Sequence, residues 1–143
     1  MNNVIISIKG KQKSVGSNEW DVTEFTTEGL FEPTENGYKI SYDESSMIGA
    51  ENVKSEVSIE DGLIVEVART GHVSSRMIIE KSKRHSCFYS TPEGDFTIGI
   101  FGKSVTARLR EEKGEIYLSY TIDVNGSLIS ENKMEIKIKG IKQ

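Results

Sequence analysis

The sequence predicts an all-β protein built as an antiparallel meander, and three observations support this fold class. Glycine-containing turns recur along the chain, apolar and polar residues alternate between them, and almost no stretch has the spacing of an amphipathic helix. Asn-Gly and Asp-Gly between apolar runs are strong hairpin signals, because both central residues of such turns need φ > 0. Strands joined this tightly are antiparallel. The five predicted turns are Asn36-Gly37, Asp61-Gly62, Thr91-Pro92-Glu93-Gly94, Glu112-Lys113-Gly114 and Asn125-Gly126.

The first half of the chain supplies the early strands of the meander. Residues 4–8 and 20–31 are rich in β-forming residues but irregular, whereas residues 38–43 alternate with Tyr38, Ile40 and Tyr42 on one face. The stretch 44–55 lacks this alternation and predicts a loop or one short helical turn. Residues 53–59 are β-rich again, and in residues 63–68 the side chains of Leu63, Val65 and Val67 share a face.

The second half continues in the same way. Residues 77–81, 87–90 and 96–101 are predicted as irregular strands, and residues 105–110, 116–124 and 134–139 alternate cleanly. A meander of this many strands with one apolar face must either close into a barrel or fold into two packed sheets, because an open sheet leaves edges that can pair with other chains. We therefore predict a closed up-and-down β-barrel of about eight to ten strands, with a β-sandwich as the alternative.

Composition is that of one soluble domain. The 143 residues are 36% hydrophobic and 28% charged, and no linker or low-complexity tract divides them. We expect a single barrel domain over residues 1–143. No segment has the length of a signal-peptide core or a membrane-spanning helix, so no membrane association is expected. Because Cys87 is the only cysteine, no intrachain disulfide can form, and a cytoplasmic location is expected.

Charge is unevenly distributed around a net value of −4. Residues 17–66 hold thirteen Asp or Glu against two Lys. A basic patch follows, in which Arg76, Lys81, Lys83 and Arg84 are candidates for a phosphate or nucleic-acid surface. We favour the alternative that acidic and basic hairpins neutralise each other outside the barrel, because the patch lacks interleaved aromatic residues and the whole chain is acidic. Nucleic acid is therefore not expected as a partner.

Several short motifs, in order along nearly the whole chain, resemble those of the YwiB-like family of small bacterial proteins. They are Thr27-Glu28-Gly29, the run Tyr38 to Ser45, Arg69-Thr70-Gly71, the run Tyr89 to Gly94, and Leu118-Ser119-Tyr120. The resemblance implies a calycin-like, lipocalin-type β-barrel of bacterial cytoplasmic origin, and it brings no assigned activity. In place of the Gly-x-Trp that usually opens a lipocalin, the chain has Gly16-Ser17-Asn18-Glu19-Trp20.

Arg69 is the leading candidate for a functional residue. It continues the inward parity of Val65 and Val67, so its guanidinium should point into the barrel or its mouth, where a charge needs a partner. The candidates are Glu24, Asp43, Glu44, Tyr42 and Tyr120. Two interpretations remain open: a structural plug that closes a barrel end, or a clamp formed by Arg69, Tyr42, Tyr120 and Glu24 for the anionic head of a ligand. In the second, the apolar part of the ligand would lie against Val65, Phe96, Ile98 and Leu118.

No pattern in the sequence predicts a metal site, a cofactor site or a catalytic residue. His72 and His85 do not share the spacing of a metal-binding pair, and Cys87 is expected to be a small packed hydrophobe. No Gly-x-Ser-x-Gly elbow frames a serine. Adjacent carboxylates such as Asp43-Glu44 and Glu111-Glu112 would point to opposite faces of a strand.

Three classes of function are compatible with these sequence features. The first is a binding module for a small amphipathic or anionic molecule inside the barrel. The second is a structural or interaction protein with a filled interior, forming a homodimer or docking a partner through exposed apolar residues such as Ile64, Ile78 and Phe101. The third, an enzyme, would use carboxylate, tyrosine and arginine groups at the barrel mouth.

Overall fold

Ten antiparallel strands form one closed barrel in the computed structural model, which describes residues 2–43, 53–61, 63–71, 74–110 and 113–141. Each strand pairs with the next along the chain, and β1 closes the ring by pairing with β10. The predicted up-and-down barrel is confirmed, and the sandwich alternative is excluded by this closure. The strands are β1 (Asn2–Ser14), β2 (Asp21–Thr34), β3 (Gly37–Asp43), β4 (Lys54–Glu60), β5 (Ile64–Thr70), β6 (Ser74–Glu80), β7 (Arg84–Thr91), β8 (Gly94–Arg110), β9 (Lys113–Val124) and β10 (Ser127–Gly140).

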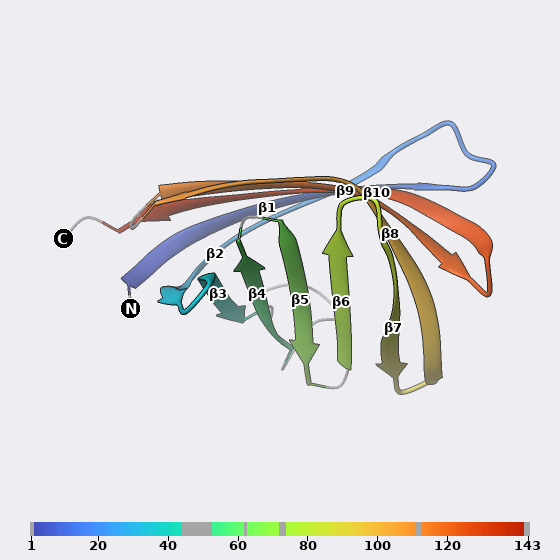
Figure 1. Cartoon of the computed structure of the whole chain (residues 1–143), viewed down its shortest axis with the longest axis horizontal. Coiled ribbons are helices and arrows are strands. Elements are labelled where there is room, and N and C mark those ends of the chain that lie inside the picture. The colour runs from blue at the N-terminus through green and yellow to red at the C-terminus, as the bar shows by residue number, and fades with distance from the viewer. Residues whose placement is uncertain (1, 44–52, 62, 72–73, 111–112, 142–143) are drawn as a thin grey trace.

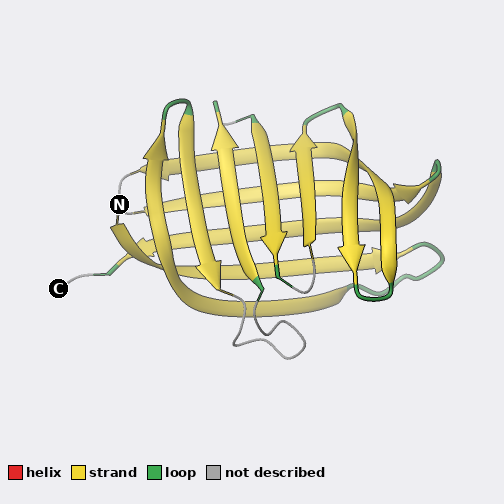
Figure 2. Ribbon diagram, turned by 90° about the horizontal axis from the view of Figure 1, so that it is seen from below, coloured by secondary structure: helices red, strands yellow, loops and turns green. Residues whose placement is uncertain are grey.

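The barrel is flattened into two layers whose strands run across each other (Figures 1 and 2). Long strands β1, β9 and β10 form one layer, and short strands β3 to β7 form the other. Two strands belong to both layers: β2 pairs with β1 over most of its length and with β3 from Gly29 onward, while β8 pairs first with β7 and then, from Gly99, with β9. These two strands form the corners of the barrel.

The corner in β8 explains why two predicted strands are one. The runs 96–101 and 105–110 are separated by a β-bulge between Gly102 and Ser104 instead of by a turn. A bulge bends a strand and increases its twist without ending it. Gly102 also packs against the β6–β7 turn, where its carbonyl accepts a hydrogen bond from the Ser82 N–H at 2.8 Å. The bend therefore carries β8 from the short-strand layer to the long-strand layer.

The predicted turns are mostly where the sequence places them. Asn125 and Gly126 both have positive φ, as a type I′ hairpin requires, and Asp61 also adopts positive φ. The prediction for Asn36-Gly37 is wrong in detail, because Gly37 is already paired with Thr34 in the sheet and the turn is formed by Glu35 and Asn36. Gly114 likewise lies inside β9. The stretch 44–52, part of the predicted loop, lies outside the described residues.

Inward-facing side chains of both layers form one apolar core. The alternation in the sequence holds in β5, where Val65 and Val67 are buried, but Leu63 is exposed in the turn before the strand. No helix among the described residues is long and apolar enough to cross a bilayer. The buried core comprises Val4, Ile6, Phe31, Ile40, Val57, Ile59, Val65, Val67, Ile79, Cys87, Ile100, Ile116, Leu118, Tyr120, Ile136 and Ile138.

Substituting Gly102 by Ala is expected to destabilise the barrel, because a Cβ there would overlap the backbone carbonyl of Glu80 and the corner would have to move. Overpacking of this kind costs about 1–3 kcal/mol. Gly10→Ala is the matched control, since a Cβ at Gly10 would meet its nearest neighbour, Thr23 Oγ1, only at 3.7 Å. Chemical denaturation should give a clear loss for Gly102→Ala and little change for Gly10→Ala; equal effects would contradict this account of the corner.

Candidate functional site

One rung of inward-facing residues on the short-strand layer is polar and aromatic, whereas the neighbouring rung is largely apolar. Strand pairing places these residues side by side, because each is the direct cross-strand partner of the next. Arg69 lies near the middle of the rung, with Ser55 on β4 and Ser75 on β6 on either side of it. The full rung is Tyr42, Ser55, Arg69, Ser75, Tyr89 and Phe96.

The adjacent rung supplies the apolar floor. It comprises Ile40, Val57, Val67 and Met77, paired in turn on β3 to β6, and Cys87 paired with Ile98 on β7 and β8, all hydrophobic. Ser55 and Ser75 are 1% and 6% exposed, so the hydroxyls beside Arg69 are almost completely removed from water. Arg69 itself is partly buried. A guanidinium in such a setting is more strongly attracted to an anion than one on the surface.

A cavity of about 260 Å³ opens beside this rung, between the two layers. Its polar lining includes Arg69, Tyr42, Ser75 and Tyr89 from the short-strand layer. The opposite wall comes from the long-strand layer and is mainly apolar. Phe25 and Tyr42 meet across it with ring centroids 6.2 Å apart. The remaining lining residues are Ile8, Gly10, Thr23, Val67, Met77 and Met134.

Arg69 and Tyr42 are therefore brought together as the sequence predicts, and the inward parity of Arg69 is correct. Neither residue is without an interaction partner in the structure. Glu44, another predicted partner, lies outside the described residues. Asp43 follows Tyr42 on the strand and is exposed, so its side chain belongs to the outer face of β3.

The position of Glu24 differs from the one that the sequence predicts. Glu24 is on the outer face of β2, where its carboxylate lies 3.7 Å from Lys9 Nζ, and it takes no part in the cavity. The reason is the parity of β2: Phe25 faces inward, so Glu24 must face outward. Its position opposite Lys9 in the β1–β2 register makes it an exterior ion-pair partner.

Tyr120 faces inward but does not line the cavity beside Arg69. It lies on β9 opposite Gly102 and Asn132, and only 6% of it is exposed. Burial raises the pKa of its phenol to about 12. Tyr120 is thus a core residue, and of the four residues in the predicted clamp only Arg69 and Tyr42 line the cavity.

The apolar residues predicted to lie against a ligand are not the ones that line the cavity. Val65, Phe96, Ile98 and Leu118 do not line the cavity; Val67, Met77, Phe25, Ile8 and Met134 do so instead. Ser55, Ser75 and Tyr89 were not predicted as neighbours of Arg69. The sequence indicates that these three side chains face inward and how long the hairpins are. It does not give the register between strands that places them on one rung.

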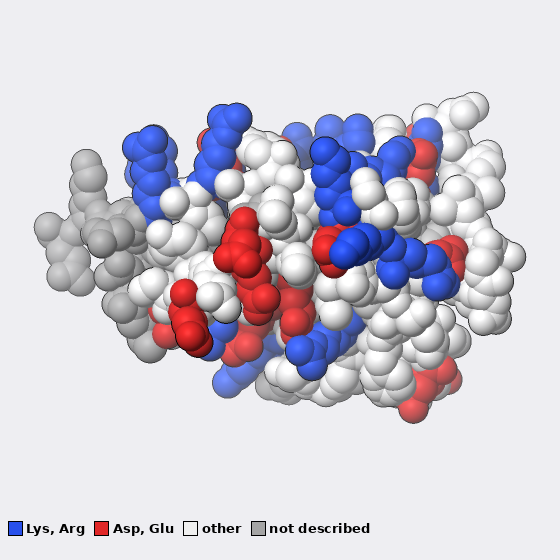
Figure 3. All heavy atoms as spheres, in the orientation of Figure 1, with Lys and Arg blue, Asp and Glu red and all other residues white. Residues whose placement is uncertain are grey.

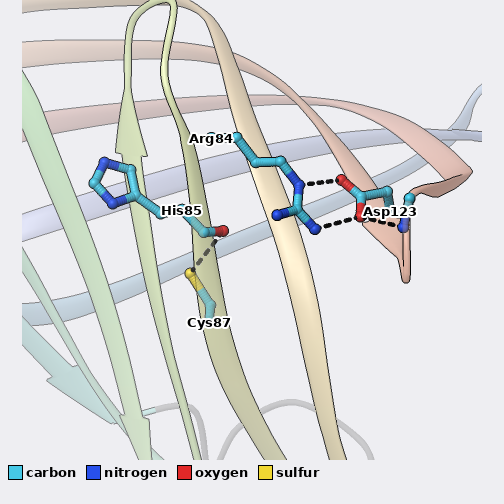
Figure 4. Close-up of polar contacts among 5 residues, drawn as sticks. Arg84, His85, Cys87 and Asp123 are labelled. Atoms are coloured by element: carbon cyan, nitrogen blue, oxygen red, sulfur yellow. Dashed lines mark hydrogen bonds and ion pairs between the residues drawn. The ribbon is translucent and has the colours of Figure 1, made fainter.

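The candidate basic patch is largely neutralised by neighbouring carboxylates. Arg76 pairs with Glu66 on β5, and Lys83 lies 3.2 Å from Glu80. Arg84 donates two hydrogen bonds to Asp123, at 2.9 and 2.7 Å, across Gly99 of the intervening strand (Figure 4). The Arg76 and Lys83 ion pairs lie within the β5–β6 hairpin and the β6–β7 turn, and only the Arg84–Asp123 pair joins separate hairpins. Lys81 is exposed beside them.

Gly99 is what allows Arg84 to reach Asp123. A side chain at Gly99 would overlap the guanidinium, so the glycine leaves a path across β8. Arg84 lowers the pKa of Asp123, first through their hydrogen bond, and the Gly126 N–H lowers it further at the β9–β10 turn. The pair therefore joins β7 to the end of β9.

His85 and Cys87 are close to this pair but form no reactive centre with it. His85 Nε2 lies 3.0 Å from Glu80 Oε1. Cys87 is buried, and its Sγ lies 3.8 Å from the His85 backbone oxygen instead of contacting Asp123 (Figure 4). Burial raises the pKa of the Cys87 thiol. His72 lies outside the described residues. Among the residues that the structure describes, no three His, Cys, Asp or Glu side chains gather as a metal site.

Comparisons with known proteins give the same fold without a role. The family model described as "Domain of unknown function (DUF1934)" matches residues 6–136. The chain is 26% identical over 137 residues to the uncharacterized beta-barrel protein YwiB of Bacillus subtilis (strain 168), covering 96% of this chain and 93% of that protein. The crystal structure of the ywiB protein from Bacillus subtilis matches with a TM-score of 0.84, covering 99% of this chain and 93% of that one.

Replacing Asp123 by Asn is expected to lower the melting temperature at pH 7 and to lower it less near pH 3. Because Arg84 lowers the pKa of Asp123 in the folded state, the carboxylate stabilises the fold above its unfolded-state pKa. That contribution is lost as the pH falls through the folded-state pKa. Thermal unfolding of both proteins at the two pH values tests this, with Glu93→Gln in an exposed turn as the control. An equal loss at both pH values would contradict it.

Proposed function

The chain belongs to the family described as Domain of unknown function (DUF1934), and from the geometry of its cavity we propose that it is a binding module for a compact amphipathic anion. The anionic head would contact Arg69, and the apolar body would lie between the two layers of the barrel. The single observation that carries this proposal is an inward-facing arginine at the wall of a cavity whose other walls are mostly apolar.

Arg69 suits a carboxylate or phosphate for geometric reasons. A guanidinium offers parallel N–H donors that bind two oxygens of one anion, and such charge-assisted bonds are stronger than neutral ones. The hydroxyls of Ser75 and Tyr42, which line the same cavity, can donate further hydrogen bonds. Since Arg69 and Tyr42 already have interaction partners, the ligand would share those contacts or replace them.

The rest of the cavity limits the size and polarity of the ligand. Val67, Met77, Ile8, Phe25 and Met134 present an apolar surface, and the two methionines can adapt to an irregular shape. The volume of about 260 Å³ is slightly below the range of about 300–1,000 Å³ usual for drug-sized ligands. A short aliphatic or aromatic acid therefore fits better than a long-chain lipid.

Thermal unfolding with three probes of equal chain length tests the proposal. Hexanoate should raise the melting temperature, whereas hexanol and hexylamine should raise it little, because only the carboxylate pairs with Arg69. At a hexanoate concentration of 100 times Kd the stabilisation would be about 2.7 kcal/mol.

Substitutions at Arg69 assign the effect. Arg69→Gln should abolish stabilisation by hexanoate, and Arg69→Lys should retain part of it, because a lysine keeps the charge but not the paired donors. Arg76→Gln, on the outer face of β6, is the matched control and should respond as the original protein does. If Arg69→Gln simply lowers stability and hexanoate has no effect on the original protein, Arg69 is a structural plug and the proposal fails.

A further inference from the structure

Cationic side chains dominate the outer face of the long-strand layer. We define the long-strand face as the outward side chains of β1, β9, β10 and residues 103–110 of β8. In Figure 3 blue side chains follow the upper edge of the molecule, where Figure 1 draws these strands. Among the described residues the face carries the cations Lys9, Lys11, Lys13, Lys103, Arg108, Arg110, Lys113, Lys133, Lys137 and Lys139, against the carboxylates Glu115, Asp123, Glu131 and Glu135.

This excess of cations contrasts with the net charge of the whole chain, which is −4. The negative side chains gather elsewhere, and a group of them lies over the middle of the short-strand layer in Figure 3. Of the four carboxylates on the long-strand face, Asp123 is already bound by Arg84. Glu131 contacts both Lys13 and Lys103, at 3.4 and 4.0 Å. Glu135 contacts Lys137 at 3.1 Å, and Glu24 of the adjoining strand β2 contacts Lys9 at 3.7 Å. Cations still outnumber carboxylates on this face of an acidic protein.

Like charges are placed directly opposite each other on this face. Lys11 on β1 is the cross-strand partner of Lys133 on β10, and Lys139 on β10 is the partner of Lys113 on β9. Such pairs destabilise a sheet in the absence of an anion. Glu111 and Glu112, which precede Lys113 in the sequence, lie outside the described residues, so we rely on the pair of Lys11 and Lys133.

A surface groove of about 380 Å³ lies beside Lys11 and Lys133. Lys9 also lines it, and the rung that contains Lys11 and Lys133 continues into Ser119 on β9 and Ser104 on β8. Ammonium groups and hydroxyls in one groove are suitable donors for phosphate oxygens. Tyr117, which is 38% exposed, lines the same groove.

We propose that the long-strand face binds single-stranded nucleic acid, with the phosphates on Lys11 and Lys133 and a base against Tyr117. Alternate residues of a strand lie about 6.8 Å apart, so successive lysines on β1 form a row of positive charge that an extended backbone can follow. An exposed aromatic ring beside such a row is the usual platform for stacking a base.

The features of the face favour a single strand over an anionic membrane. Glu135 and Glu115 lie among the lysines and would repel a uniformly negative bilayer, whereas a flexible strand can pass between them. Tyr117 is the only large hydrophobic side chain among the residues that line this groove and are substantially exposed in the described structure. Ile5 on β1 and Ile129 on β10 are also exposed, but neither lines this groove, whereas a peripheral membrane protein usually presents several such side chains together.

The groove and the proposed ligand cavity take their charged residues from different layers, although Met134 lines both. Lys11 and Lys133 point outward from β1 and β10, while Arg69 points into the barrel from β5 on the other layer. Binding of nucleic acid therefore survives Arg69→Gln, and binding of hexanoate survives substitutions on the long-strand face. The two proposals fail separately.

Fluorescence anisotropy with a labelled oligo(dT) of about 20 nucleotides tests the inference at low and moderate salt. The double variant Lys11→Gln/Lys133→Gln should weaken binding at least tenfold and make the plot of log K against log salt shallower by about 1.4, as expected for two lost phosphate contacts on a single strand. Its melting temperature should stay within a few degrees of the original, which separates a binding role from a structural one.

The control variant is Lys54→Gln/Lys81→Gln, which removes the same charge from exposed lysines of the short-strand layer and the β6–β7 turn. It should bind oligo(dT) as the original protein does. The inference is overturned if oligo(dT) does not bind at low salt, if the two double variants lose affinity equally, or if vesicles rich in phosphatidylserine bind more tightly than oligo(dT).

Discussion

Pairing between the first and last strands is the constraint on which the rest of this structure depends. The β1–β10 ladder runs from Val4 with Gly140 to Ser14 with Ser130, so the two ends of the chain are joined over eleven residue pairs. It removes the edges that a ten-strand meander would otherwise expose. It also gives the inward side chains a shared interior, which is where Arg69 and its cavity lie.

Closure of a flattened barrel requires two sharp corners, and the chain provides them with glycine. At Gly29 on β2 and Gly102 on β8, any side chain would overlap backbone from a neighbouring strand. These corners let each strand pair within both layers and leave the layers facing each other. The space beside Arg69 is bounded by residues from both layers, so the candidate site is a consequence of the corners as much as of the residues that line it.

The sequence predicts the barrel well because the signals for its strands and turns are local, each carried by a few neighbouring residues. Alternation in β5 indicated the inward position of Arg69, and the Asn125-Gly126 turn indicated a hairpin whose two φ values are both positive. Glu24 was misplaced because its run has few clean alternations, although the inward Phe25 fixes its direction. Tyr120 was assigned the correct face but the wrong neighbours.

Strand register decides which inward residues meet, and register depends on long-range pairing that no single segment of sequence specifies. The long-strand face was missed for the same reason, since its lysines come from both ends of the chain.

The chain has one tryptophan, and its surroundings give the molecule a built-in optical reporter. Trp20 ends the β1–β2 loop and lies close to two ammonium groups, with Lys13 Nζ 5.3 Å and Lys133 Nζ 5.1 Å from the ring centroid. Such cation–π contacts sense any change in the position or hydration of the lysines. Indole emission therefore monitors the outer surface of β1 and β10 in the unlabelled protein, and does so without interference from a second indole elsewhere in the chain.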